Sequence, residues 1–236
     1  MAECGMIFNG EMVRAILDGR KTQTRRVMKP QPEPCPAPRG GHWWASNVFK
    51  TMLHVEEEMQ NGKGGWGGLA GDACPFGTVG DHIWVRETWA DVNLEGIPAV
   101  AYRADDDVYS LMDDKSFLDE DGAFNYEDPR VAKYSFAAWY SDLISGTEGR
   151  WTPSIHMPRW ASRITLEITD VRVERLNDIS DTDANAEGVM ADDLSPARYV
   201  FGSLWQSIYG ADNPQSWQAN PWVWVIDFRR ITGGAA

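Results

Sequence analysis

Cysteine is scarce in this chain, and its scarcity excludes two kinds of scaffold. The 236 residues contain only Cys4, Cys35 and Cys74, which are too few and of the wrong parity for a disulfide framework. A structural zinc site favours paired spacing such as Cys-x-x-Cys, which the chain lacks. A metal held by Cys35, His42 and Cys74 is an open alternative, but free buried thiols are the default. We therefore expect no metal and no organic cofactor.

Long apolar runs are also absent. No stretch approaches the roughly 18 to 20 apolar residues that cross a bilayer. The sequence does not open with a basic segment followed by an apolar core, as a signal peptide would. The sequence therefore predicts a protein of the cytoplasm without a membrane span. An apolar fraction of 43% over this length fits one globular domain, or one domain with large insertions.

Basic residues are outnumbered, with 22 Lys and Arg against 35 Asp and Glu, and the formal net charge is −13. An acidic surface repels a nucleic-acid backbone, which disfavours a long non-specific DNA or RNA footprint. The charge is uneven, because residues 14–29 hold six cationic side chains and one acid, whereas residues 104–128 hold ten acids and one lysine. A local positive pocket on an acidic body suits a small anionic or polar ligand, or a single-stranded end, better than a duplex.

The cations centre on one stretch that follows a short apolar segment. Residues 12–17 predict a helix, and Gly19 predicts its end, since glycine readily takes the left-handed conformation found after a last turn. An extended chain beyond it would alternate, placing Lys21, Gln23 and Arg25 on one face and Thr22, Thr24 and Arg26 on the other. A solvated basic loop is the simpler interpretation. The alternative is an anion or nucleotide site at which a threonine hydroxyl binds or reacts.

A second motif follows a turn at Gly80-Asp81. Residues 83–89 are rich in β-branched and aromatic side chains and predict a strand, as do residues 99–103. Glu87 would be costly to bury unpaired, so we expect it to meet a cation, near Arg86 or in the basic motif. Three of the twelve tryptophans lie close to motifs and are candidates for stacking a base, although packing is the commoner role: Trp84, Trp89 and Trp160.

The C-terminal half predicts a strand over residues 162–176, a helix over 201–209 and a last strand over 222–229. Between the first two, Ser180 predicts a helix N-cap with Asp181 and Asp183 in the first turn. Gly188 would close this helix, which leaves Glu187 at the C-terminal end, where the helix dipole disfavours a carboxylate. A nearby lysine is the simplest partner for Glu187.

The composition of two segments predicts insertions. The first, near residues 30–75, contains a proline-rich stretch that favours an extended path and a glycine-rich loop over 61–71. The second, near 104–150, is acidic, and its first part has the low apolar content of a partly mobile excursion. A helix over residues 130–143 is expected within it.

Four segments together resemble the ASCH domain family, a branch of the PUA-like fold associated with RNA and modified nucleobases. Gly19-Arg20-Lys21-Thr22-Gln23-Thr24-Arg25-Arg26 is similar to the family signature Gly-x-Lys-Thr-x-Thr-x-Arg. Residues 80–89 are similar to its Gly-Asp-x-(aliphatic or aromatic)-x-Val-(Arg or Gly)-Glu segment, residues 177–188 to its later helix and residues 220–228 to its closing strand. The segments lie in the family's order over nearly the whole chain, and the likeness is to the long members that phages and prophages often encode.

This resemblance implies an α+β fold, a PUA-like mixed and mostly antiparallel β-barrel with flanking helices and two insertions, in a single domain over residues 1–236. Small bacterial members hydrolyse N4-acetylcytidine to cytidine and acetate. Their implied catalytic lysine, threonine and glutamate fall on Lys21, Thr24 and Glu187. The residues expected to bind the substrate are Arg20, Thr22, Arg25, Arg26, Trp84, Arg86, Glu87 and Trp89.

Other functions stay open at this point. The same pocket would serve a binding module for a modified nucleotide or single-stranded RNA, with Lys21 and Arg25 or Arg26 on phosphate and a tryptophan on a base. A ribonuclease would use the lysine as a base on a ribose hydroxyl. The simplest alternative is a small phage accessory protein in which the motif is structural.

Overall fold

The structure is a computed structural model that describes residues 1–60, 68–190 and 195–231. Contacts within the chain cluster into two compact units. Unit 1 comprises Met1–Cys4, Ala15–Ile83 and Leu166–Ile231. Unit 2 comprises, among the described residues, Gly5–Arg14 and Trp84–Thr165. The single domain over residues 1–236 with two insertions stays a prediction.

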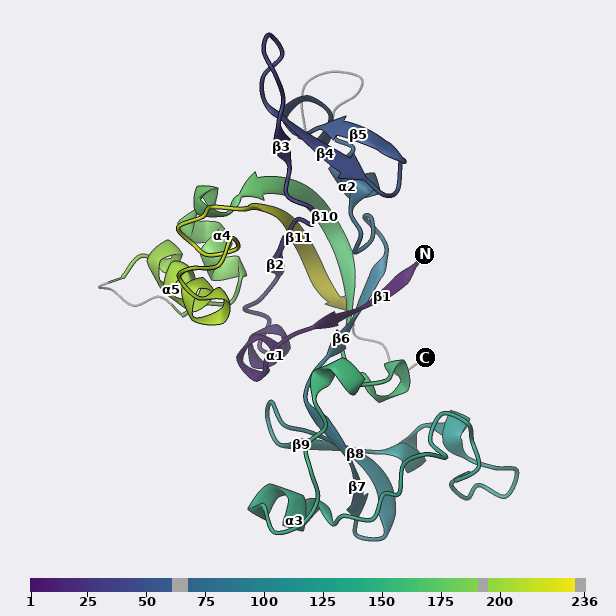
Figure 1. The fold of residues 1–236 in the computed structure, drawn as a ribbon. Coiled ribbons are helices and arrows are strands. Elements are labelled where there is room, and N and C mark those ends of the chain that lie inside the picture. Colours follow the sequence, from purple (N-terminus) through teal and green to yellow (C-terminus); the bar gives the residue numbers. More distant parts are fainter. Residues whose placement is uncertain (61–67, 191–194, 232–236) are drawn as a thin grey trace. The chain divides into compact units, whose positions relative to one another are not determined.

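Five strands form the main sheet, in the order β1-β6-β10-β11-β2 (Figure 1). Their bounds are Glu3–Ile7 for β1, His82–Arg86 for β6, Thr165–Arg175 for β10, Trp222–Ile231 for β11 and Gln23–Val27 for β2. The sheet ends at β1 on one side and β2 on the other, so the strands in the described part of the chain close no barrel. The expected mixed α+β fold with antiparallel sheets is confirmed, whereas the closed β-barrel is wrong, because the remaining strands pair in two separate three-stranded sheets.

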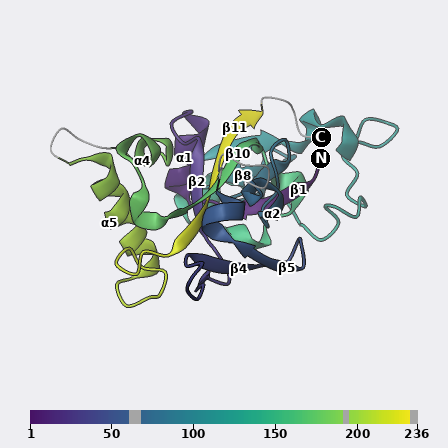
Figure 2. The ribbon, with the colours of Figure 1, turned by 90° about the horizontal axis from the view of Figure 1, so that it is seen from above.

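β11 pairs antiparallel with β2, and the register decides which side chains share a face. Arg25 lies opposite Val225 and Gln23 opposite Asp227, whereas Thr24 lies opposite Ile226. Val225 belongs to an apolar cluster formed with two helices, α4 (Asp181–Ala186) and α5 (Ala197–Tyr209). α4 lies beside β2 in both views of the ribbon (Figures 1 and 2). The face of β2 that carries Gln23 and Arg25 is therefore the face covered by these helices.

The other elements of unit 1 precede β6. The predicted helix before the basic motif is confirmed as α1 (Gly10–Leu17), which begins in unit 2 and ends in unit 1. β3 (Glu33–Pro34), β4 (His42–Ser46) and β5 (Thr51–His54) form a small antiparallel sheet, and the turn Val55–Met59 and α2 (Ala70–Ala73) follow it. Trp44 of β4 packs edge-on against Trp224 of β11, with ring centroids 5.3 Å apart. Residues 61–67 of the predicted glycine-rich loop lie outside the described residues.

Unit 2 contains the third sheet, in which β8 (Ile97–Tyr102) pairs with β7 (Trp89–Leu94) and β9 (Asp107–Ser110). The acidic segment that follows supplies Phe117, Phe124 and Phe136 to a buried cluster around Trp89. Its helical pieces are the short turns Leu111–Asp113 and Lys115–Phe117 and the helix α3 (Tyr140–Ser145). Further single turns lie at Ser154–His156, Arg159–Ala161 and, in unit 1, Leu176–Asp178.

The expected helix over residues 130–143 is wrong, since only its last residues are helical. Phe136 has a positive φ of 48° and is buried, so the chain turns there to place the ring in the core. None of the helices in residues 1–60, 68–190 and 195–231 has the length and apolar character of a transmembrane span.

Two glycines with left-handed backbones end the helices that flank Lys21. Gly19 follows α1 with φ 73°, as predicted, and Gly188 follows α4 with φ 87°. A Cβ added at Gly188 would lie 2.9 Å from the Cβ atoms of both Ala15 and Lys21, whereas one added at Gly19 would meet nothing within 4 Å. The two positions thus share a backbone conformation and differ in the space around it.

We expect Gly188→Ala to lower the free energy of unfolding by about 2 to 5 kcal/mol, since a left-handed backbone costs an alanine roughly 1 to 2 kcal/mol and overpacking roughly 1 to 3 kcal/mol more. Gly19→Ala is the matched control and should show only the backbone part. Urea denaturation of both variants measures the difference. Equal losses would show that the close approach at Gly188 relaxes without strain.

Candidate functional site

A buried ion pair lies at the basic motif. Lys21 is 2% exposed, and its ammonium donates to the Oε2 of Glu187 at 2.6 Å, to the carbonyl of Glu187 at 2.9 Å and to the carbonyl of Gln23 at 2.8 Å. An ammonium carries three N–H donors, so all three are satisfied. Glu187 is itself 6% exposed. The structure therefore brings together two of the three residues predicted to be catalytic.

Local backbone structure fixes this pair. α4 is capped by the Ser180 hydroxyl, which accepts a hydrogen bond from the backbone N–H of Asp183, as predicted. Glu187 follows the last residue of α4 and forms a backbone bridge with Lys21. The prediction that a lysine compensates the unfavourable position of Glu187 at the helix end is confirmed.

Arg25 connects the ion pair to a larger set of charges. Its Nη1 lies 3.4 Å from Glu187 Oε1, and its Nη2 lies 3.0 Å from Glu174 Oε2 and 3.8 Å from Asp183 Oδ2. Glu174 stands on β10 and Asp183 on α4. The guanidinium of Arg25, whose side chain has no exposed area, therefore holds together three carboxylates, one on β10, one on α4 and one directly after α4.

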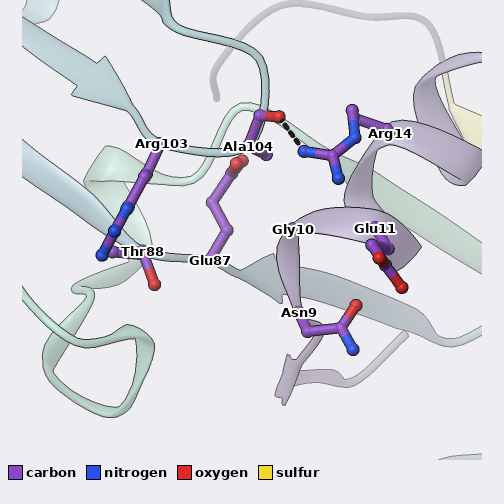
Figure 3. A pocket seen from close by; sticks show the side chains of 8 residues that line it. All are labelled: Asn9, Gly10, Glu11, Arg14, Glu87, Thr88, Arg103 and Ala104. Atoms are coloured by element: carbon purple, nitrogen blue, oxygen red, sulfur yellow. Dashed lines mark hydrogen bonds between the residues drawn. The ribbon is translucent and has the colours of Figure 1, made fainter. Parts of the chain in front are cut away.

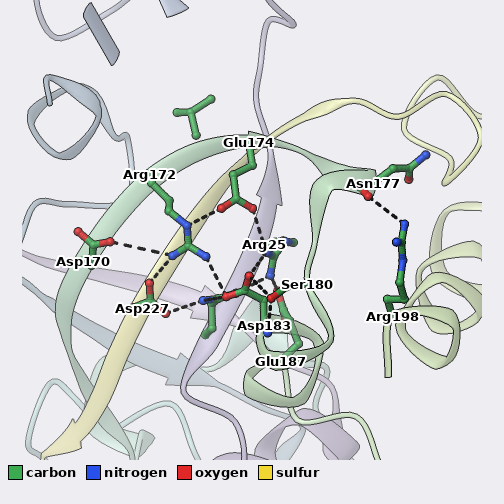
Figure 4. Close-up of polar contacts among 12 residues, drawn as sticks. Arg25, Asp170, Arg172, Glu174, Asn177, Ser180, Asp183, Glu187, Arg198 and Asp227 are labelled. Carbon is green, nitrogen blue, oxygen red and sulfur yellow. Dashed lines mark hydrogen bonds and ion pairs between the residues drawn. The ribbon is translucent and has the colours of Figure 1, made fainter. Parts of the chain in front are cut away.

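Arg172 of β10 is the second arginine that contacts several carboxylates (Figure 4). It lies 2.5 Å from Glu174, 3.0 Å from Asp183 and 2.6 Å from Asp227 of β11. The amide of Gln23 donates to Asp183 at 3.1 Å and to Asp227 at 2.6 Å. We call the whole set the sheet-face network; its members are Lys21, Gln23, Arg25, Arg172, Glu174, Asp183, Glu187 and Asp227.

The network has three cations and four carboxylates, and burial and neighbouring charges shift the pKa values of Lys21 and Asp183. Burial lowers the pKa of Lys21, and the charges of Arg26 and Arg25 act in the same direction, while contact with Glu187 opposes them. For Asp183, burial raises the pKa, but hydrogen bonds from Ser180 and Gln23 and the charges of Arg172 and Arg25 outweigh it, so the pKa is lowered. Burial thus makes Lys21 less basic, while the partners of Asp183 favour its ionised form.

The remaining residues of the basic motif are placed differently. Thr24 is 2% exposed, and alternation along β2 puts it with Arg26 on the face opposite to Gln23 and Arg25. Arg20 is more exposed; it pairs with Asp18 at 2.9 Å and donates to the carbonyl of Gly188 at 3.0 Å. Thr22 is exposed, and its backbone N–H donates to Ala186. The structure therefore gathers Lys21, Arg25 and Glu187, while strand alternation directs Thr24 to the other face of β2.

In unit 2, Glu87 is 1% exposed and forms a bidentate ion pair with Arg163, with both N–O distances 3.0 Å. The expectation of a cation for Glu87 is confirmed, but the expected source is wrong, since Arg163 precedes β10 and no local pattern marks it. Arg163 also contacts Asp105 and Asp107 and lies 4.1 Å from the centroid of the Tyr102 ring. Burial raises the pKa of Glu87, although Arg163 opposes the shift.

The aromatic candidates are engaged in packing. Trp89 has no exposed surface and meets Tyr134 and Trp160 edge-on, at centroid distances of 5.3 and 5.7 Å. Arg86 donates to the backbone carbonyls of Ser154 and Ile155 and lies 5.4 Å from the ring centroid of Trp84. Stacking on Trp89 would require its neighbours to move, and the binding roles of Trp84, Arg86 and Trp89 stay predictions.

In the described ranges, no three His, Cys, Asp or Glu side chains gather as a metal ion would need, so Cys35, His42 and Cys74 form no such group. Comparison of the chain with protein-family models, curated proteins and solved structures gives no match. The chemistry of the site is therefore argued from its geometry. A desolvated lysine touching a buried carboxylate can exchange a proton over a short distance, which is the basis of general acid and base catalysis.

Replacing Lys21 should show how strongly the pair holds the fold. We expect Lys21→Met to lower the free energy of unfolding by about 3 to 5 kcal/mol, since it leaves a buried carboxylate without its partner. Arg20→Met removes an exposed ion pair one residue away and should cost about 1 kcal/mol or less. Chemical denaturation of both variants measures the contrast. A loss for Lys21→Met no larger than that of the control would mean that Glu187 finds another partner.

Asp183 should make stability depend on acid pH. Its folded pKa lies below the ordinary value of 3.8, so its stabilising contribution is present above that value and is lost as the pH falls through the lowered folded pKa. We expect the unfolding free energy of Asp183→Asn to fall less steeply below pH 3.8 than that of the unchanged protein. Asp212→Asn, at an exposed position, is the control and should keep the original slope. Parallel slopes for all three proteins would argue against this role of Asp183.

Proposed function

We propose that this protein hydrolyses the amide bond of an acylated cytosine nucleoside, converting N4-acetylcytidine to cytidine and acetate. The observation that carries the proposal is the buried contact of 2.6 Å between Lys21 and Glu187. The resemblance of the basic motif to the ASCH signature supports it and supplies the substrate class. Membership of that family, the PUA-like fold and a cytoplasmic location are parts of the same proposal.

The pair contains the acid and the base that the reaction needs. Transfer of one proton from Lys21 Nζ to Glu187 Oε2 gives a neutral amine and a carboxylic acid. Burial favours the neutral form of Lys21, because it penalises the charged ammonium. The reaction leaves Lys21 protonated and Glu187 ionised. A proton then moves from Lys21 to Glu187 across the same short contact, so the neutral pair is restored in each cycle.

The chemical steps balance as follows. The Lys21 amine takes the proton of the Thr24 hydroxyl while Thr24 Oγ1 bonds to the acetyl carbon. The Glu187 carboxyl gives its proton to N4 of the cytosine as the C–N bond breaks, which releases cytidine. Water then cleaves the acetyl ester of Thr24 and releases acetate. Arg25 beside Glu187 is the nearest guanidinium of the network for stabilising the oxyanion.

The position of Thr24 sets a condition on this mechanism. Because alternation puts Thr24 on the opposite face of β2 from Arg25, the hydroxyl has to reach Lys21 past the edge of the strand, where Lys21 itself lies outside β2. A water molecule activated by the same pair is the alternative nucleophile. It would attack the acetyl carbon directly and need no ester intermediate.

A binding module without catalysis is the second candidate, and one observation favours it. All three donors of Lys21 are occupied, and its partners include two backbone carbonyls, as in a structural ammonium. A ligand would then be held by the outer side chains of the motif, and no product would form.

The first test is incubation of the purified protein with N4-acetylcytidine and chromatography for cytidine. We expect product from the unchanged protein and a loss of about 100-fold or more in Lys21→Ala and Glu187→Gln, the scale of general acid or base catalysis. Lys50→Ala, at an exposed position, is the control and should keep full activity. Circular dichroism confirms that each variant is folded.

The nucleophile is decided by two further variants. Thr24→Ser should keep turnover and Thr24→Val should lose it if the threonine attacks, whereas both stay active if water does. If N4-acetylcytidine raises the melting temperature but no cytidine forms, the hydrolase proposal is contradicted and the binding module is favoured. Cleavage of unmodified RNA, lost in Lys21→Ala, would instead identify a ribonuclease.

A further inference from the structure

Two buried glutamates of this chain are held in different ways. Glu87 lines a cavity of about 440 Å³ in unit 2 (Figure 3), and a single guanidinium, that of Arg163, donates to both of its oxygens at 3.0 Å. Glu187 has its two oxygens on two different cations, since Oε2 lies 2.6 Å from the ammonium of Lys21 and Oε1 lies 3.4 Å from Nη1 of Arg25. Glu187 therefore has one close contact to a group that can give up a proton and one long contact to an arginine, which cannot.

The side chain of Gln23, which is 2% exposed, accounts for the long contact of Arg25. Nη1 of Arg25 donates to the amide oxygen of Gln23 at 2.5 Å, compared with 3.4 Å to Glu187. Nε of Arg25 is buried and has no hydrogen-bond partner in the described part of the chain. The guanidinium therefore makes its hydrogen bonds there through its two terminal nitrogens, and Nη2 contacts Glu174 at 3.0 Å. Gln23 is thus the nearest partner of the nitrogen that faces Glu187.

Two aspartates fix the orientation of the Gln23 amide. Its Nε2 donates to Oδ1 of Asp227 at 2.6 Å and to Oδ1 of Asp183 at 3.1 Å. A carboxylate accepts hydrogen bonds and a guanidinium only donates them, so the amide nitrogen has to face the aspartates and the amide oxygen has to face Arg25. Glutamine meets both demands, whereas a glutamate at this position would turn an oxygen toward the aspartates.

This inference rests on the proposed hydrolysis, in which a proton passes from Nζ of Lys21 to Oε2 of Glu187. A cation in close contact favours a carboxylate over a carboxylic acid, so an arginine bonded closely to Oε1 would oppose that transfer. We propose that Gln23 is a positioning residue of this site: its amide oxygen holds Arg25 away from Glu187, so that the carboxylate stays able to accept the proton.

Gln23→Met tests the side chain alone. Methionine offers Arg25 only a weak acceptor and offers the aspartates no donor, while the backbone carbonyl that accepts from Lys21 stays in place. We expect kcat for the release of cytidine from N4-acetylcytidine to fall about tenfold, which is less than the roughly 100-fold of losing the acid or the base itself. KM should stay within about twofold, because the change affects the proton transfer and leaves substrate binding intact.

Gln31→Met is the matched control. The amide of Gln31 also lies in unit 1, where it donates to the carbonyls of Met28 and Trp222 and accepts from the backbone N–H of Trp222. The same substitution there removes as many hydrogen bonds as at Gln23, but none of them involves the sheet-face network, so kcat should stay within about twofold. Equal losses of kcat in the two variants would overturn the proposal, since any broken amide contact would then lower the rate.

Arg25→Met decides whether Gln23 acts through the arginine. If it does, adding Gln23→Met in that background should lower kcat by less than about twofold, because the group that Gln23 restrains is gone. If the variants with Arg25→Met do not fold, a crystal structure of Gln23→Met decides, and Nη1 of Arg25 should then lie closer to Oε1 of Glu187 than 3.4 Å. An additive loss of kcat, or an arginine that has not moved, would overturn the proposal.

Failure of the hydrolysis and failure of this inference give different results. If the unchanged protein forms no cytidine, the hydrolysis is contradicted and the role of Gln23 falls with it. If the unchanged protein forms cytidine and Gln23→Met forms it equally fast, only the role of Gln23 is contradicted.

Discussion

A buried ammonium and a buried carboxylate have to stay together, and much of unit 1 is arranged to keep Lys21 and Glu187 in contact. Removing each ion from water costs several kcal/mol, which only close geometry and further hydrogen bonds offset. Lys21 obtains these from two backbone carbonyls as well as from Glu187. The carbonyl of Glu187 is in place because Gly188, which follows it with a left-handed backbone, lets the end of α4 approach Lys21 closely.

The sheet extends this constraint beyond one pair. Gln23 and Arg25 are two residues apart on β2 and therefore share a face, and so do Arg172 and Glu174 on β10. Asp227 faces Gln23 from β11. All present polar groups to the same face, where α4 adds Asp183. Apolar residues of β2, β11 and the two helices bound the charges on this face. Lys21, Arg25 and Glu187 are therefore buried in a packed interface, and strand register and α4 fix the geometry of the partly exposed charges around them.

How much of this follows from the sequence depends on the range of each interaction. The helix before Gly19, the cap at Ser180 and the partner of Glu187 are set by neighbouring residues or by one strong local conflict, and they were predictable. Arg172 and Asp227 were not, since they meet only when β10 lies beside β11, and they are 55 residues apart. The contact of Arg163 with Glu87 was not predictable either, since the two residues are 76 positions apart and meet only in the folded chain. Barrel closure also failed as a prediction, because it depends on which edge strands pair. Proximity to a motif suggested Trp89 as a stacking platform, but only the folded core reveals that it is buried.

The charges of the sheet-face network are already paired, which bears on what the network can bind. In the sheet-face network every carboxylate already has a cationic or amide partner, so a ligand has to replace an existing contact before it can touch Lys21 or Glu187. A substrate amide can replace the contact between Lys21 and Glu187 once the pair is neutral. Its N–H and carbonyl would then make hydrogen bonds to these two side chains. Chemistry at Lys21 should therefore be limited by how readily the proton moves to Glu187 and opens the pair.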